Sequence, residues 1–316
     1  MKFGEAIKTV RNRKWLASIL LSILVTIFFL PSVSSAQIEI TLKNKFIDEY
    51  KDRATIEATF TVDKAHAKPN SPSKDGDMHV AGRAPEIELP VVAEIMNAKF
   101  EKPSVDLVHN LEGTGTPAKT SGAWRIWCEH AGSSHQIQGA SLEPFATTNP
   151  DHVFEIHPVT SLEGTSLLGS LKKIKGFKTK NAEDAFSKYE SIKCHLSVNA
   201  SKKTTTITTS MAGYNYVEFI MEITGEQKVV DDGRFVMASV LDLDEEMLVY
   251  NRRMVFIKDS PPELKVKDLK PGDRLHVLGI PRISLKLIDW RIDNRQTRPE
   301  ALDWDLPYEM IIVAVY

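Results

Sequence analysis

The chain has 316 residues, of which 42% are hydrophobic and 26% are charged, the composition of a globular protein long enough for a sizeable core and two domains. Residues 1–36 hold five of the 40 basic residues and one of the 42 acidic residues, so the rest of the chain carries 35 against 41, a net charge of −6. This acidic balance excludes a general nucleic-acid binder, which needs a basic surface.

The first 36 residues have the pattern of a secretory signal peptide. Basic residues precede an uncharged apolar run over 15–30, and small residues end the segment at Ala36. We expect cleavage after Ala36 and a mature protein exported to the periplasm or the cell exterior. An uncleaved anchor helix is the alternative, although the run is slightly short for a membrane span. Nothing else in the chain approaches that length, so we expect no membrane span in the mature protein.

The next part of the chain has the alternation of β-strands. Residues 102–120 contain enough sequence for a short helix and a loop, which separate three strand-like runs from two more. This order is that of the OB-fold, a small five-stranded barrel, so we predict an OB-like barrel over 45–160. The strand-like runs are 53–67, 78–84, 89–98, 123–130 and 152–159.

Residues 161–213 are predicted to form a mixed connector. A helix is expected over 181–192, where Asn181 is a suitable N-cap and Ala185, Tyr189 and Ile192 share one face. The Ser/Thr-rich residues 197–213 are either an exposed strand or a linker.

The C-terminal part repeats the strand-rich pattern, and a Pro-bounded connection over 259–273 holds a short helical piece. DLKPGDRLHVLGIPRI (268–283) resembles the fourth strand of many OB-folds, and the resemblance extends over about 216–292. It implies a second OB-like barrel over 214–316. The expected strands are 216–224, 233–243, 247–257, 274–283, 284–292 and 308–316.

The whole chain is therefore predicted to be mainly β, with two OB-like antiparallel β-barrels joined by a connector with one short helix. D-G-D-x-H (75–79) and E-I-H-P-V (155–159) also resemble motifs in exported bacterial proteins of uncharacterised function. That resemblance implies no known chemistry.

Polar residues of the first predicted barrel fall on one face. Side chains alternate across a strand, so burial of Met78, Val80 and Ile156 would turn their neighbours to the other side. The polar face collects Asp77, His79, Arg83, Glu94, Arg125, Trp127, Glu155 and His157.

Two acid-x-His pairs, Asp77/His79 and Glu155/His157, make this face a candidate metal site. Residues two apart on a strand lie about 6.6–7 Å apart, which allows both side chains to reach one ion. Imidazole with carboxylate suits a divalent metal such as zinc, manganese or iron. We therefore predict His79 and His157 as metal ligands, and acid–base chemistry without a metal is an alternative.

Further roles follow from the same face. The candidate catalytic residues are Asp77, Glu94, Arg125 and Glu155, and the candidate ligand-binding residues are Arg83 and Trp127. The structural alternative is a solvated polar sheet face, with Gly76 in a hairpin turn and Arg83 paired with Glu94 across strands.

The two cysteines, Cys128 and Cys194, allow one disulfide in an oxidising compartment or two buried thiols. Two cysteines without CxxC spacing make no cysteine zinc site.

The function expected first is binding or scaffolding outside the cytoplasm by a barrel face, with an unknown ligand or protein as partner. The alternative is a metal-assisted hydrolase of nuclease or phosphoesterase type on the acid/His face. Phosphate-binding glycine loops, G-x-S-x-G and H-E-x-x-H are absent from the sequence.

Overall fold

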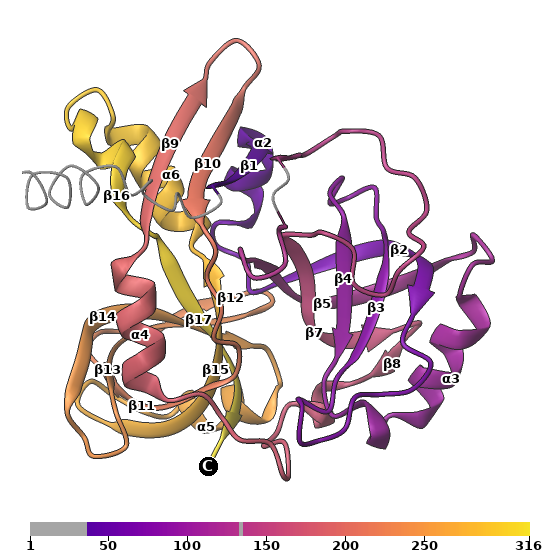
Figure 1. The fold of residues 1–316 in the computed structure, drawn as a ribbon. Coiled ribbons are helices and arrows are strands. Elements are labelled where there is room, and N and C mark those ends of the chain that lie inside the picture. The colour runs from indigo at the N-terminus through magenta and orange to yellow at the C-terminus, as the bar shows by residue number, and fades with distance from the viewer. Residues whose placement is uncertain (1–36, 133–134) are drawn as a thin grey trace, which may run out of the picture. The chain divides into compact units, whose positions relative to one another are not determined.

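The computed structural model describes residues 37–132 and 135–316, and the predicted signal peptide lies outside them. The described chain is mainly β and forms two closed five-stranded barrels and a separate open sheet (Figure 1). The OB-like shape of both barrels is thus confirmed. No helix among the described residues has the length and apolar character needed to cross a membrane.

The first barrel closes in the order β4-β3-β2-β5-β7, and β4 pairs with β7 to complete the ring. The helix α3 connects the third strand to the fourth, and β8 extends β7. The strands and helices of this part are β2 (Thr55–Ala65), β3 (Met78–Arg83), β4 (Val91–Ile95), η1 (Ala98–Phe100), α3 (Lys102–Leu111), β5 (Pro117–Ile126), β7 (Phe154–Leu162), β8 (Thr165–Ser166) and η2 (Leu168–Ser170).

The second barrel has the same succession and the same closure. Its strands pair in the order β11-β15-β17-β14-β13, and β11 pairs with β13 to close the ring, while α5 connects the third strand to the fourth. The elements are β11 (Val217–Ile223), β12 (Lys228–Val230), β13 (Gly233–Leu241), β14 (Met247–Ile257), α5 (Pro261–Val266), β15 (Arg274–Ile283) and β17 (Tyr308–Val315).

The strand directions differ from the purely antiparallel prediction. In each barrel the third and last strands run parallel, β4 with β7 and β14 with β17, and the other pairs that close the barrels are antiparallel. The physical reason lies in the connections, because the helix and the fourth strand return the chain to the end of the barrel from which the third strand started.

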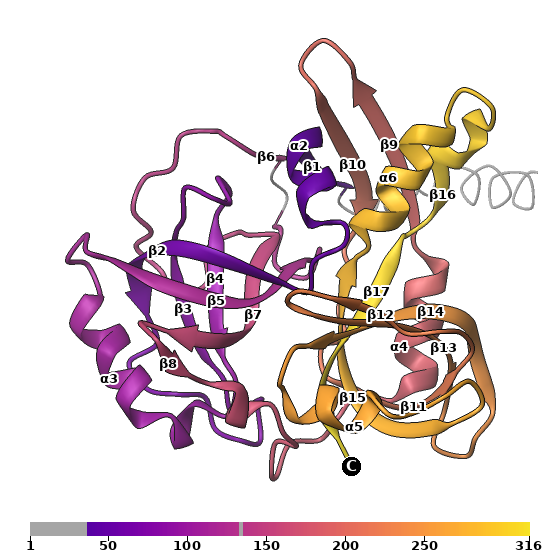
Figure 2. The same cartoon turned by 180° about the vertical axis from the view of Figure 1, so that it is seen from behind.

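An open sheet that the sequence patterns did not predict contains five strands in the order β16-β9-β10-β1-β6. The hairpin of β9 and β10 comes from the predicted connector, and it pairs with the first described strand on one side (Figure 2). The elements here are β1 (Gln37–Lys43), α2 (Asn44–Tyr50), β6 (His135–Ile137), α4 (Ala182–Ser191), β9 (Lys193–Asn199), β10 (Thr204–Ser210), η3 (Pro299–Leu302) and β16 (Asp303–Asp305).

One predicted strand is wrong. Residues 284–292 fall in a helix, α6 (Leu285–Asn294), in which Ser284 is the N-cap and accepts a hydrogen bond from the backbone of Leu287. The buried side chains of Leu285, Ile288 and Arg291 recur every third residue, which is a helical spacing. The last strand of the second barrel is instead β17, which pairs with β15 and β14.

Apolar and polar contacts join the two barrels. A buried cluster contains Met96 and Ala123 of the first barrel together with Leu278 and Ile311 of the second. Beside it, the guanidinium of Arg282 lies 3.5 Å from the Trp124 ring centroid. This guanidinium donates to Glu309 and to three first-barrel carbonyls, those of Arg53, Ala54 and Trp124. A charge buried in this way needs such partners, because an unpaired one is costly.

Candidate metal centre

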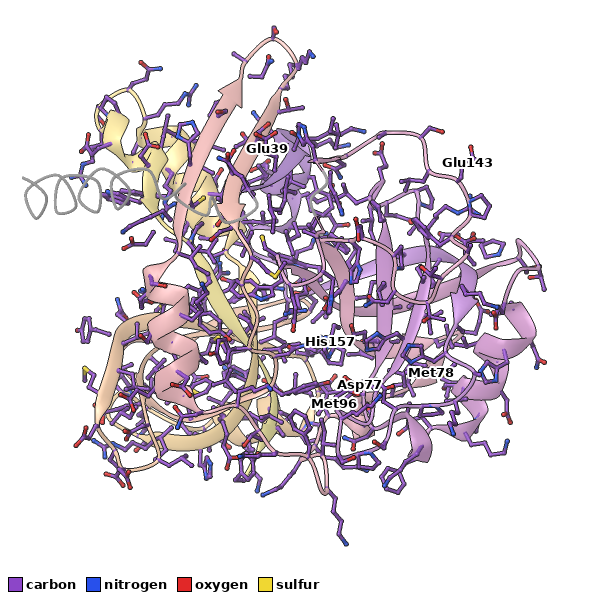
Figure 3. The ribbon with its side chains drawn as sticks, viewed as in Figure 1. Glu39, Asp77, Met78, Met96, Glu143 and His157 are labelled. Carbon is purple, nitrogen blue, oxygen red and sulfur yellow. The ribbon has the colours of Figure 1, made fainter. Side chains whose placement is uncertain are left out.

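Three of the predicted polar residues, Asp77, Glu94 and His157, converge on the outer face of the first barrel. Asp77 directly precedes β3, Glu94 lies in β4 and His157 lies in β7. Alternation places them there, since Ala93 and Ile156 are register partners in the barrel core and their neighbours point outward. Figure 3 shows Asp77 and His157 on the side of the first barrel that adjoins the second.

The spacing of one ligand atom from each residue makes this trio a candidate metal site. One ligand atom from each residue lies within 4.8 Å of the other two. His157 Nδ1 is 3.3 Å from a Glu94 oxygen, and His157 Nε2 is 3.5 Å from Asp77 Oδ2. Two carboxylates and one imidazole are ligands that zinc, manganese and iron accept.

All three side chains are buried. Asp77 and His157 are 0% exposed and Glu94 is 3% exposed. The Oδ1 atom of Asp77 is buried without a hydrogen-bond partner among the described residues. A buried carboxylate oxygen without a partner is costly, and a bound cation would remove that cost.

A tyrosine of the second barrel covers the trio. The Tyr216 hydroxyl lies 2.8 Å from His157 Nε2 and donates a hydrogen bond to Asp77 Oδ2. Its backbone is in the left-handed region, with φ at 55°, directly before β11. Backbone strain of this kind in a non-glycine residue often accompanies a functional site.

A buried ion pair, Arg125–Glu155, lies next to the trio and contacts His157. Glu155 forms a hydrogen-bonded ion pair with Arg125 and lies 3.3 Å from His157 Nδ1. Arg125 is fully buried, and its Nε donates to the carbonyl of Pro281 in the second barrel at 2.8 Å. Arg125 therefore balances one carboxylate and holds it against the histidine.

The electrostatics of the cluster follow from burial and from these pairs. Burial raises the pKa of Glu94 to about 8 and also raises that of Asp77. Burial alone would lower the pKa of His157, but the neighbouring carboxylates outweigh it and raise the value to about 10. Burial likewise opposes ionisation of Glu155, yet Arg125 holds its pKa well below the usual range. Without a bound ion, three carboxyl groups thus face the cationic Arg125 and His157 in a buried space, and a metal held by His157 would take the place of a proton on its ring.

His79 belongs to the edge of the cluster and not to the converging trio. Its Nε2 lies 3.6 Å from the same Glu94 oxygen that His157 approaches, and its side chain is 14% exposed. The ring stacks on His66 with centroids 4.7 Å apart, and burial lowers its pKa. Both predicted histidines therefore contact one carboxylate, but only His157 is in the three-ligand group.

The polar face differs from the alternative of a solvated sheet surface, because its central members are buried under the second barrel. The two predicted ligand-binding residues lie away from the trio. Arg83 forms a two-bond ion pair with Asp63, and not with Glu94. Trp127 is 1% exposed and packs edge-on against Tyr189.

The turn before β3 has the predicted left-handed glycine, since Gly76 has φ at 74°. It ends a longer loop between β2 and β3 and is not a two-residue hairpin turn. Cys128 and Cys194 are both buried in the structure as free thiols.

Two contributors to the site were missed at the level of sequence. Tyr216 was assigned only as the start of a strand, and a single tyrosine more than 50 residues beyond the first barrel carries no local signal of its role. His152 lies 3.5 Å from Glu155, but alternation in the predicted strand 152–159 put it on the opposite face, and in the structure it precedes β7. Both come to the cluster through tertiary packing.

No protein-family model matches this chain, and no curated protein matches it.

Proposed function

We propose that this protein is an exported binding protein that holds a divalent metal ion on the outer face of its first barrel. Asp77, Glu94 and His157 are the proposed ligands. The observation that carries the proposal is the convergence of three buried ligand atoms within 4.8 Å of one another. It is supported by Asp77 Oδ1, which is buried and has no hydrogen-bond partner among the described residues.

The role proposed for the ion is structural. The ligands come from the loop before β3, from β4 and from β7, so one ion would join that loop to two strands of the barrel. Tyr216 and Arg125 extend the same network to the second barrel. A metal bound only by the folded chain stabilises that chain by its binding free energy.

Burial favours this role over the metal-assisted hydrolase. A substrate has to touch a catalytic ion, and a catalytic zinc keeps one position open for water. The ligands Asp77 and His157 have no exposed surface, and Tyr216 covers them. The acid/His face is therefore better suited to retaining an ion than to reaching a phosphodiester.

Metal analysis of purified variants tests the proposal. The mature protein is stripped with a chelator, dialysed against zinc, manganese or iron(II), and analysed for metal content. We expect one bound ion per chain in the parent protein and loss of that ion in Glu94→Gln, which keeps the side chain's shape and removes an anionic ligand.

A matched control comes from an acid–His pair outside the cluster. Asp303 and His195 form an exposed pair at 2.5 Å in the open sheet, so Asp303→Asn should keep the full metal content. Equal metal loss in both variants would mean that the ion binds surface pairs, and absence of metal from the parent protein would reject the site.

A hydrolysis assay separates the two functions. The metal-loaded protein should cleave bis(p-nitrophenyl) phosphate no faster than the free ion does. Cleavage that requires both the ion and Glu94 would favour the hydrolase instead.

A further inference from the structure

A pocket with a lysine-rich lining lies at the tip of the β9–β10 hairpin in the open sheet. Its volume is about 390 Å³. Three segments distant in sequence meet there, namely the end of β1 with the start of α2, the loop after β6, and the hairpin turn. The lining residues are Lys43, Asn44, Lys45, Gln138, Lys202, Lys203 and Thr204.

The positive charge of this pocket is largely unpaired. Lys43 makes an ion pair with Glu88 at 2.6 Å. Lys45, Lys202 and Lys203 are exposed, and none of the three has a carboxylate partner among the described residues. No carboxylate is among the described residues that line the pocket. Like charges that line one pocket repel one another, and an anion bound among them would relieve the repulsion.

The backbone that carries these lysines is held in place. The amide of Asn44 donates to the carbonyl of Lys203 at 2.8 Å, and the amide of Lys43 donates to the Gln138 side chain at 2.9 Å. Lys43 and Thr204 are also register partners of β1 and β10. A pocket formed in advance loses less free energy to ordering when a ligand binds.

We propose that this pocket binds a compact, multiply charged phosphate anion of the polyphosphate class. Ammonium groups are common phosphate binders, and Thr204 adds a hydroxyl donor to the lining. A concave site between three segments fits a discrete anion better than a flat membrane surface. The chain beyond residue 36 has a net charge of −6, whereas four of the seven described residues that line this pocket are lysines, so the pocket is a local basic site that attracts an anion.

Titration calorimetry with sodium tripolyphosphate at low salt tests the proposal. The parent protein should bind saturably, with an affinity that falls as sodium chloride is added because the lysines are exposed. The triple variant Lys45→Glu, Lys202→Glu, Lys203→Glu should bind at least about tenfold more weakly, since three attractive charges become repulsive.

A control variant carries the same change of net charge elsewhere. Three exposed lysines lie in separate parts of the chain away from the pocket, namely Lys68, Lys188 and Lys265. Their replacement by glutamate should leave the affinity for tripolyphosphate within about twofold of that of the parent protein. Equal loss in both triple variants would show a response to net charge alone and would overturn the proposal. Circular dichroism verifies that both triple variants fold. If the variant with three pocket lysines replaced does not fold, the single variant Lys202→Ala is used in its place.

Vesicles of equal parts phosphatidylcholine and phosphatidylglycerol distinguish the source of the phosphate. The proposal expects tripolyphosphate to bind and the vesicles to bind weakly or not at all. Vesicle binding that depends on the three lysines, without tripolyphosphate binding, would assign the surface to a lipid headgroup and refute the proposal. No tripolyphosphate binding by the parent protein would refute it as well.

Discussion

At the scale of single residues, Arg282 joins the two barrels through hydrogen bonds to three first-barrel carbonyls. It is fully buried, stacks on Trp124 and pairs with the buried Glu309 at 2.7 Å. Replacing it by methionine should lower the free energy of unfolding by roughly 3–5 kcal/mol, because Glu309 loses its main partner in a buried place. Urea denaturation measures this change.

The control for that experiment is Arg298→Met. Arg298 is exposed and lies 6.0 Å from the Trp290 ring centroid, with no ion pair among the described residues. We expect a change within about 0.5 kcal/mol, as for most surface substitutions. The double variant Arg282→Met, Glu309→Gln should recover part of the lost stability. If Arg282→Met were as stable as the parent, the guanidinium would not contribute to joining the barrels.

The two cysteines permit a second prediction at this scale. Burial raises the pKa of Cys128 to about 12 and that of Cys194 to about 11. The thiolate is the reactive form, so both thiols should react slowly with a disulfide reagent in the native protein and quickly in urea. Intact mass under non-reducing conditions should show both thiols. A mass two hydrogens lower, with no labelling in urea, would mean that the disulfide forms.

The sequence predicted that the residues of the site share one face of the barrel, but it did not predict which of them converge. Period-two alternation placed Asp77, Glu94 and His157 on one face because core neighbours such as Met78 and Ile156 point the other way, and this follows from local chemistry. Their burial could not be predicted, since it depends on Tyr216 and on the packing of a second barrel. For the same reason Arg83, on the same predicted face, pairs with Asp63 instead.

At the scale of secondary-structure elements, the close approach of β5 and β7 positions the histidine of the site. A Cβ atom added to Gly122 in β5 would lie 2.4 Å from the carbonyl oxygen of Pro158, the residue after His157. Gly122→Ala should therefore destabilise the protein by about 1–3 kcal/mol, as overpacking does.

Gly169 provides the comparison for this variant. A Cβ atom there meets no atom within 4 Å, so Gly169→Ala should leave the midpoint of thermal unfolding nearly unchanged. A similar midpoint for both alanine variants would show that β5 and β7 can separate without cost, contrary to the expected strain.

Some helices and strands could be assigned from the local sequence and others could not. The helix α4 matches the prediction closely because its N-cap Asn181 accepts a hydrogen bond from Asp184, which is a local signal. The strand prediction for residues 284–292 is wrong because so short an apolar run fits both a strand and a helical period, and Ser284 caps a helix there. In the open sheet, β1 pairs with β10 of a hairpin more than 150 residues later, and no local sequence pattern predicts such a pairing.

At the scale of the whole molecule, the barrels should unfold together. The apolar cluster with Met96 and Leu278 and the bonds of Arg282 cross between the barrels. We therefore expect tryptophan fluorescence and far-ultraviolet circular dichroism to report one coincident urea transition, as in two-state unfolding. Two separated transitions would instead mean that each barrel is stable alone and that the contacts between them are weak.

The most direct test of the account is the anomalous scattering of a zinc-loaded crystal of the mature protein. We expect one strong peak at the proposed metal centre on the outer face of the first barrel. The peak should lie about 2.0–2.2 Å from an oxygen of Asp77, an oxygen of Glu94 and a nitrogen of His157. The peak should be absent from Glu94→Gln crystals prepared in the same way. A parent crystal with zinc only at surface sites, and with His157 still hydrogen-bonded to Tyr216, would contradict the proposed metal centre.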